Sequence, residues 1–211
     1  MKRMFFFALI TMFVLVNSFN TVCAQWSSDP LLNTPVSVFS GEQTVPKLAV
    51  TPAGDSYLAW YDNRNGNYDI YMQYLNQDGE PQWTQNGIAI STHQQDTWVT
   101  DFDLAIDSSG NAIVAFNDIR DGGDWDVYVY KISSAGVLLW GNDGISISPA
   151  NNTNFEAAPK IVQTKAGNTV ITWFTEESGQ AIRMQKISDA GSKLWGDDGV
   201  GQNMDVESRE R

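Results

Sequence analysis

The sequence predicts an all-β fold, a partial β-propeller of three four-stranded antiparallel blades that follows a cleaved signal peptide. Three observations support this prediction. The same pattern recurs at a period of 55 to 57 residues, as it does between Trp83, Trp140 and Trp195. Short apolar or alternating runs are bounded by Gly and Asp turn residues, which is typical of strands. No segment shows a sustained 3.6-residue apolar period, so we expect almost no helix.

The first 24 residues have the features of a signal peptide. Lys2 and Arg3 provide a positive start, residues 4–16 are apolar apart from one threonine, and residues 22–24 offer small side chains before Gln25. The run is shorter than the about 20 residues needed to span a bilayer. An uncleaved anchor would need a longer run, and a lipoprotein would need the Leu and small residue that usually precede a lipidated cysteine. We expect a secreted, extracellular or cell-surface protein, with the periplasm also open.

Cysteine content and charge exclude several classes of site and partner. Cys23 is the only cysteine, so the mature chain has no disulfide, zinc or thiol chemistry. The formal charge is −12, and removal of Lys2 and Arg3 takes it to −14. An acidic surface repels phosphate and anionic lipid. We therefore expect neither nucleic acid nor an anionic membrane surface as a partner. No apolar stretch after residue 16 approaches the length of a membrane span, so we expect none in the mature protein.

Each copy of the repeat reads as four short strands. In the first copy they are predicted over residues 47–51, 57–61, 68–75 and 82–91. Asp78-Gly79 between the last two is a hairpin signal, because glycine there tolerates a positive φ. Gly87 is expected to mark a bulge or bend in the outer strand.

The period divides the chain into predicted units. They are a signal peptide (1–24), a lead-in (25–45), blade 1 (46–96), blade 2 (97–154), blade 3 (155–205) and a tail (206–211). Within the lead-in, residues 33–39 align with the outer strand of a blade but have no preceding blade of their own. We expect them to form an unpaired outer strand.

A tryptophan follows the same glycine turn in every copy. Trp83, Trp140 and Trp195 each stand four residues after Gly79, Gly136 and Gly191. A large ring just after a tight turn is expected to wedge between neighbouring blades, so these six residues are predicted to be structural. A β-sandwich, the main competing fold, would not require this recurrence.

The pattern Trp60-Tyr61-Asp62-Asn63-Arg64, followed by Asp69-Ile70-Tyr71, Gly79, Trp83 and Gly87, resembles the repeats of secreted bacterial β-propeller proteins. It is also distantly similar to the Asp-box repeats of sialidases. The match to the Asp-box departs in detail, because Asp78 directly precedes Gly79 and Ala135 replaces the aspartate in the second copy. The resemblance implies a propeller fold and, for a sialidase-type site, arginines that hold a carboxylate.

The most polar loops lie between the second and third predicted strands of each copy. Their candidate ligand-binding residues are Asp62, Arg64, Asp118, Arg120, Asp121 and Asp124. Arg64 and Arg120 occupy equivalent positions, whereas the third copy has Glu177 there. Asp118, Asp121, Asp124 and Asp126 carry oxygens that suit calcium, but their spacing does not match the twelve-residue calcium loop. We assign no metal and no cofactor, and leave calcium open.

No catalytic set is recognisable. Glycoside hydrolysis usually needs two carboxylates at a defined separation, and no spacing singles out a pair. His93, the only histidine, lies in a polar stretch without a nucleophile motif. We expect a binding module rather than an enzyme, and we expect it to take a glycan or an extracellular or envelope protein through its loop-rich face. The alternatives are a fragment of a sialidase-like glycosidase and a structural remnant without independent function.

Three blades are too few to close a propeller, since typical rings have 4 to 8. The sequence therefore predicts either the front part of a longer propeller or a homodimer in which two chains supply six blades. Either arrangement would cover apolar faces that a lone set of three blades exposes.

Overall fold

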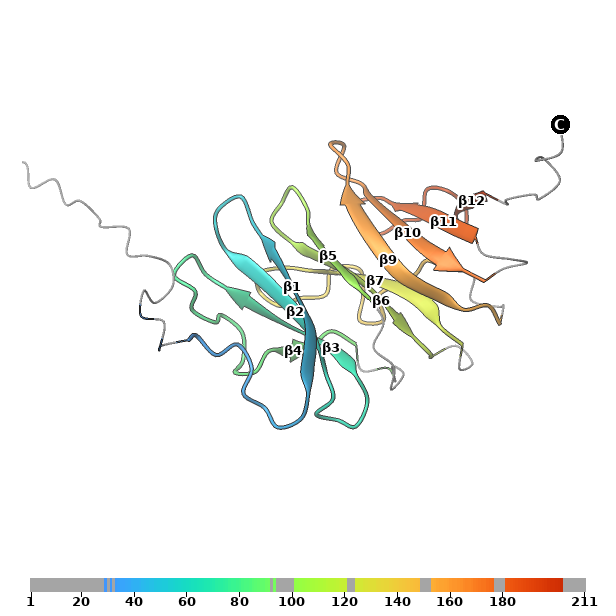
Figure 1. Cartoon of the computed structure of the whole chain (residues 1–211). Coiled ribbons are helices and arrows are strands. Elements are labelled where there is room, and N and C mark those ends of the chain that lie inside the picture. Colours follow the sequence, from blue (N-terminus) through green and yellow to red (C-terminus); the bar gives the residue numbers. More distant parts are fainter. Residues whose placement is uncertain are drawn as a thin grey trace, which may run out of the picture.

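The computed structural model describes residues 29, 31, 33–91, 93, 101–120, 124–148, 153–176 and 181–202. In this part of the chain, twelve strands form three four-stranded antiparallel sheets and no residue is helical (Figure 1). The predicted fold class is confirmed: the chain is an all-β partial propeller of three blades. The predicted signal peptide and the tail at 206–211 lie outside the described residues. None of the described residues belongs to a helix that is long and apolar enough to cross a membrane.

Each blade uses its four strands in chain order. Blade 1 contains β1 (Gln43–Val50), β2 (Ser56–Asp62), β3 (Asp69–Leu75) and β4 (Ile88–Ala89). Blade 2 contains β5 (Asp103–Ile106), β6 (Ala112–Asp118), β7 (Asp126–Ile132) and β8 (Ile145–Ser146). Blade 3 contains β9 (Glu156–Gln163), β10 (Thr169–Thr175), β11 (Ala181–Ile187) and β12 (Val200–Gln202). The strands of blades 2 and 3 fall within the predicted ranges, whereas blade 1 begins at Gln43, inside the predicted lead-in.

The blades pack face to face in chain order, with the inner strands β1, β5 and β9 next to one another (Figure 1). Alternation along each strand sends successive side chains to opposite faces. On β2, Tyr57, Ala59 and Tyr61 join the core between blades 1 and 2, while Leu58 and Trp60 point to the other side. We call the side of a blade toward the preceding blade its leading face, and the other its trailing face.

Two apolar cores fill the junctions between blades. The first combines the trailing face of blade 1 with the leading face of blade 2, including Tyr57, Ile70, Met72, Phe102, Val114, Phe116 and Tyr130. The second joins blades 2 and 3 through Ile113, Ala115, Val127, Val129, Ile161, Ile171 and Trp173. Burial of this apolar surface, at about 25 cal/mol per Å², is the main force that holds the blades together.

The repeated tryptophans contact the turn of the following blade. The indole Nε1 of Trp83 donates to the carbonyl of Ser134 at 2.7 Å, and that of Trp140 donates to the carbonyl of Asp189 at 3.0 Å. A Cβ at Gly136 would lie 3.4 Å from Trp83, and one at Gly191 would lie 2.9 Å from Trp140. These turn glycines have φ near 80°, as Gly79 does. Glycine at these turns therefore leaves room for the ring and adopts a positive φ that a side chain disfavours.

The outer strands are much shorter than predicted. The expected strand over 82–91 is reduced to the two residues of β4, with one isolated bridge between Leu75 and Pro81. The buried Gln73 side chain replaces the missing ladder: its Nε2 donates to the Thr84 carbonyl, and its Oε1 accepts from the Trp83 amide, both at 3.0 Å. A side-chain amide that bonds to backbone in this way competes with strand pairing, which is why the pattern of apolar residues overestimated this strand.

The lead-in also differs from expectation. Residues 33–42 contain no strand, so the outer strand expected over 33–39 is not formed. The Val38 amide instead donates to the side-chain Oδ1 of Asn86 at 2.8 Å, and the Phe39 ring lies against Arg64. The segment therefore rests on the leading face of blade 1 through side-chain contacts, which a strand alignment does not detect.

Candidate binding site on the loop face

The first predicted pair, Asp62 and Arg64, forms an internal tie at the end of β2. Arg64 Nε and Nη2 donate to the two Asp62 oxygens at 2.8 and 2.5 Å, and Nη2 also donates to the Asn86 carbonyl at 3.0 Å. The guanidinium carbon lies 3.9 Å from the centre of the Tyr71 ring. The Arg64 side chain is only 9% exposed and that of Asp62 is fully buried.

Blade 2 repeats this tie with a larger set of partners. Arg120 donates to both Asp118 oxygens, to the Tyr130 hydroxyl at 2.7 Å and to the Asp143 carbonyl at 2.7 Å. Its guanidinium stacks 3.7 Å from the Tyr128 ring. Bidentate Arg–carboxylate pairs are the strong, geometrically specific kind. In both blades the arginine donors are directed at the protein, which favours a structural role for these four predicted site residues.

The third blade lacks the tie. Thr175, which ends β10 as Asp62 ends β2, stands in place of the aspartate, and Glu177, in place of the arginine, lies outside the described residues. Trp60 Nε1 donates to Asp62 at 3.0 Å. The equivalent Trp173 Nε1 is buried and has no hydrogen-bond partner among the described residues.

The two aspartates differ in electrostatic environment. Burial tends to raise the pKa of Asp62, but hydrogen bonds from Arg64 and Trp60 outweigh it and hold the pKa below its ordinary value. At Asp118, by contrast, burial outweighs the contacts of Arg120 and raises the pKa of that carboxyl. Desolvation of a carboxylate always disfavours its charged form, so the same pair of residues titrates differently in the two blades.

Of the remaining predicted residues, Asp121 lies outside the described part and Asp124 precedes β7. Asp124 is half-buried, and its Oδ2 is buried without a hydrogen-bond partner among the described residues. Asp126 Oδ1 accepts from the Ser148 hydroxyl at 3.1 Å. In the described ranges, no group of three or more His, Cys, Asp or Glu side chains is arranged to hold a metal ion.

The single histidine contacts the loop between β7 and β8. His93 Nε2 lies 2.9 Å from Asp143 Oδ1, and the Asp143 carbonyl accepts from Arg120. The His93 contact lowers the pKa of Asp143, whose side chain is 80% exposed. This surface contact joins the end of blade 1 to blade 2.

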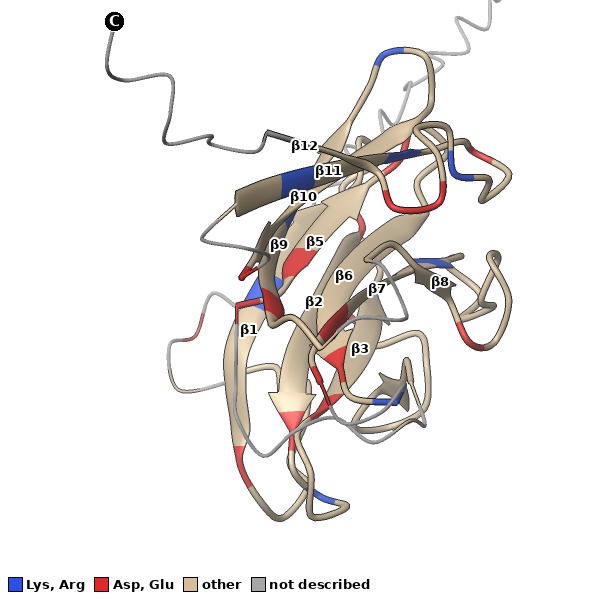
Figure 2. Ribbon diagram, turned by 90° about the vertical axis from the view of Figure 1, so that its right-hand side faces the viewer, with Lys and Arg blue, Asp and Glu red and all other residues tan. Residues whose placement is uncertain are grey.

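A polar cluster that the sequence does not predict lies on the inner strands β1 and β9 and just before β5. Asp101 Oδ1 pairs with Lys47 of β1 at 2.7 Å, and Asp101 Oδ2 pairs with Lys160 of β9. Figure 2 shows these inner strands side by side, with basic and acidic positions next to one another. The side chains of Lys47, Asp101 and Lys160 are 24%, 42% and 52% exposed. We call these three residues the inner-strand cluster.

The cluster has a recognisable origin in the chain. Lys47 and Lys160 each follow a proline, Pro46 and Pro159, that comes after a residue of positive φ. Those residues are Val45 at 50° and Ala158 at 53°, where both strands also shift register. The recurrence of a small or β-branched residue, proline and lysine is the sequence signal that was available.

Burial tends to raise the pKa of Asp101, but hydrogen bonds from Lys160 and Lys47 outweigh it and lower the pKa below its ordinary value. Asp101 is therefore ionised at neutral pH, and it is not poised as a proton donor. The neighbouring Asp103 is also hydrogen-bonded within the protein, because its Oδ2 accepts from the Ile161 amide at 2.7 Å. The cluster is suited to binding polar groups rather than to transferring protons.

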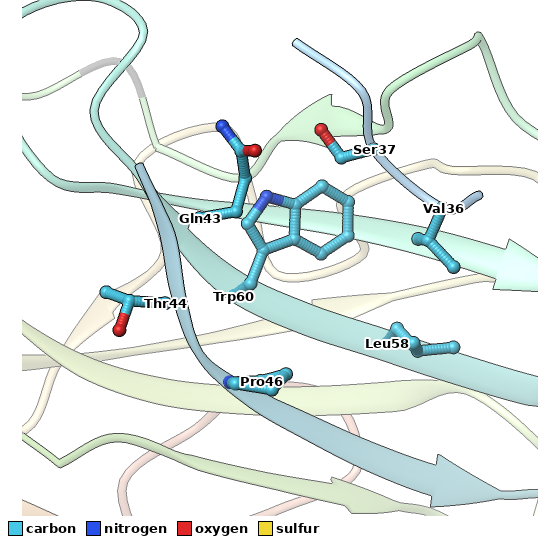
Figure 3. Close-up of a pocket in the computed structure, with 7 residues that line it drawn as sticks. All are labelled: Val36, Ser37, Gln43, Thr44, Pro46, Leu58 and Trp60. Carbon is cyan, nitrogen blue, oxygen red and sulfur yellow. The ribbon is translucent and has the colours of Figure 1, made fainter. Parts of the chain in front are cut away.

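A pocket of about 250 Å³ opens on the leading face of blade 1 (Figure 3). Trp60 and Leu58 of β2 line it together with residues of β1 and of the lead-in, namely Gln43, Thr44, Pro46, Val36 and Ser37. Most of this lining is apolar. The pocket lies between the lead-in and the inner strand.

Comparison with known proteins finds low similarity. No protein-family model matches the chain, and no curated protein matches it in sequence. An endo-arabinase from Bacteroides thetaiotaomicron aligns with 82% of this chain and 67% of its own, at 18% identity and a TM-score of 0.44. An endo-1,4-beta-xylanase from the same organism aligns over 82% and 60%, at 12% identity and 0.42. A thermostable family-43 glycoside hydrolase aligns over 78% and 58%, at 13% identity and 0.42. The chain thus spans less than two thirds of the last two proteins.

Proposed function

We propose that this chain is a non-catalytic binding module of an exported propeller protein, and that it takes a glycan at the inner-strand cluster. One observation carries the proposal: Lys47 of blade 1 and Lys160 of blade 3 converge on Asp101 of blade 2, and all three side chains remain partly exposed. Sugar hydroxyls both donate and accept hydrogen bonds, so neighbouring carboxylate and ammonium groups match a pair of them. Asp101 lies just before β5, which begins at Asp103. Because β5 and β6 are antiparallel, the start of β5 lies at the same end of the blade as the polar loop that follows β6. The cluster is therefore near these polar loops.

The geometry supports this site over the predicted Asp–Arg pairs. Arg64 and Arg120 are each 9% exposed and donate to protein oxygens, so a carboxylate ligand would have to displace a buried partner. Truncating or displacing one member of a buried charge pair is costly, about 3–5 kcal/mol. The cluster residues carry no such barrier, because all three already reach solvent. This argument also favours the binding module over a sialidase-like glycosidase.

A glycan array probed with the labelled full chain tests the proposal. Lys160→Ala and Lys47→Ala are expected to weaken binding to the recognised glycan at least about tenfold, the loss of one charge-assisted hydrogen bond. Lys165→Ala is the matched control, because Lys165 is an exposed lysine in the turn between β9 and β10, at the opposite end of blade 3. The control should bind like the unaltered chain.

Two results would overturn the proposal. One is the absence of any bound glycan with a chain whose β-rich circular dichroism and cooperative unfolding show an intact fold. The other is equal loss of binding in Lys165→Ala and Lys160→Ala. Release of free sugar from the bound glycan, abolished by Arg120→Lys, would instead support the glycosidase alternative.

A further inference from the structure

Two sheet faces, which we call the end faces, have no neighbouring blade in the described part of the chain. On the trailing face of blade 3, Val162, Ile182 and Val200 are 64%, 65% and 42% exposed. Ile182 pairs with Phe174 as Ile70 pairs with Tyr61 in blade 1 and Val127 with Asn117 in blade 2. Ile70 and Val127 are fully buried in the two junctions. Ile182 thus occupies in blade 3 the position that is buried at a junction in blades 1 and 2.

The leading face of blade 1 shows the same relation. Leu48 and Val50 of β1 are 58% and 56% exposed. Their equivalents in blade 2, Leu104 and Ile106, pack against the core between blades 1 and 2. The lead-in contacts blade 1 at Asn86 and leaves Leu48 and Val50 at the end of the inner strand exposed.

The pocket beside Trp60 matches a side chain on the opposite end face. At the first junction, the Tyr61 ring packs edge-on against the Phe102 ring of the next blade at 5.2 Å. By strand register, Phe174 of blade 3 is equivalent to Tyr61 of blade 1. In the same way, Pro46 of blade 1 is equivalent to Phe102 of blade 2. Pro46 lines the pocket (Figure 3). An incoming blade 3 would therefore direct Phe174 toward that pocket.

The hydrogen bond between a repeated tryptophan and the turn of the next blade also has an equivalent donor and acceptor on the two end faces. Trp83 and Trp140 each donate to the carbonyl two residues before the turn glycine of the next blade. No such contact is formed by Trp195 within the described residues. In blade 1 the equivalent carbonyl belongs to Gln77, two residues before Gly79.

We propose that two copies of this chain associate head to tail, with the trailing face of blade 3 in one copy packed on the leading face of blade 1 in the other. The interface continues the junctions seen twice within the chain. Phe174 enters the pocket beside Trp60, and Trp195 covers the Gly79 turn. Two identical interfaces close the assembly into a ring of six blades, within the range of known propellers.

Light scattering on a sizing column and sedimentation velocity of the chain test this proposal at about 1 to 100 µM, a range in which weak self-association is visible. We expect twice the monomer mass. The double variant Val162→Glu with Ile182→Glu blocks the trailing face of blade 3. The double variant Leu48→Glu with Val50→Glu blocks the leading face of blade 1. Each double variant alone is expected to be monomeric. Val137→Glu with Leu139→Glu is the control, because these side chains are 55% and 46% exposed on blade 2, away from both end faces.

Mixing separates this geometry from others. The two blocked variants together retain one intact head-to-tail interface, so an equimolar mixture should form a one-to-one dimer. A symmetric contact between two blade 3 faces would give no such rescue. A monomeric unaltered chain at the highest concentration, dimers of either blocked variant alone, or a ladder of larger species would overturn the closed dimer.

Discussion

Blades 1 and 3 fasten the end of their second strand in different ways. In blade 1 the indole of Trp60 and the guanidinium of Arg64 both donate to the buried Asp62. In blade 3 a threonine replaces that aspartate, and Trp173 buries an indole N–H that has no hydrogen-bond partner among the described residues. The recurring Asp-x-Arg pattern is therefore best explained as an internal fastening of blades 1 and 2, rather than as a surface that each blade offers to a ligand.

The largest expected change in the free energy of unfolding comes from removing the Asp118–Arg120 tie in blade 2. Arg120→Ala leaves the Asp118 carboxylate buried without its counter-charge, which costs about 3–5 kcal/mol. The free energy of unfolding from urea titration measures this loss. Arg183→Ala is the matched control in blade 3, where the arginine contacts the Asp198 carbonyl at a partly exposed position. It is expected to cost less than about 1 kcal/mol. An equal loss of unfolding free energy in the two variants would show that the buried tie is no more stabilising than the partly exposed contact of Arg183.

A smaller effect should separate the two tryptophans. Trp60→Phe removes a hydrogen bond to a charged carboxylate, a loss of about 1.5–3 kcal/mol in addition to the lost volume. Trp173→Phe removes the same volume but also an unpaired buried N–H, so its net cost is expected to be lower by about 1–2 kcal/mol. Phe116 already occupies this position in blade 2. Urea midpoints of both variants give the comparison, and a larger cost for Trp173→Phe would contradict it.

The smallest effect concerns acid stability. Asp62 and Asp101 have pKa values lowered below the ordinary value of 3.8 in the folded chain. The folded state therefore binds fewer protons than the unfolded state near that pH, and stability rises with pH there. The contribution is complete above the unfolded pKa and is lost as pH falls through the folded pKa.

Asp101→Asn tests the part of this effect that belongs to the inner-strand cluster. Because Asp101 is 42% exposed, we expect a loss of about 1 kcal/mol or less at pH 7, and a smaller loss at pH 2. Urea unfolding of both proteins between pH 7 and pH 2 measures the difference. An Asp101→Asn variant with the same cost at both pH values would show that its contacts do not depend on charge.

Much of the fold follows from local pattern. The alternation of Tyr57, Ala59 and Tyr61 marked a strand and its buried face, and the turn at Asp78-Gly79 marked the hairpin. Trp83 and Trp140 recur in register, and each donates a hydrogen bond to the turn of the next blade. Gln73 shows where such patterns fail: its amide satisfies backbone groups that the outer strand would otherwise pair, and no periodicity reports a side chain that substitutes for a ladder.

The site was less predictable. The polar pattern of Asp62, Arg64, Asp118 and Arg120 is typical of exposed loops. In the structure, however, Arg64 and Arg120 stack on Tyr71 and Tyr128 and pair with the two buried aspartates. Whether a polar residue meets solvent or a buried partner depends on the neighbouring strands, which a single sequence does not place. The inner-strand cluster depends on the same information, because Lys47 and Lys160 are far apart in the chain.

By itself, the sequence determined the blade as a unit: its strands, its turns and the positions that recur in register. These depend on side-chain periodicity and backbone preference, which act over a few residues. Only the tertiary structure decided which polar groups became buried ties, where Lys47, Asp101 and Lys160 converge, and which apolar faces stay open. Those outcomes depend on the stacking of whole blades, where burial and hydrogen-bond satisfaction are set by partners more than fifty residues away.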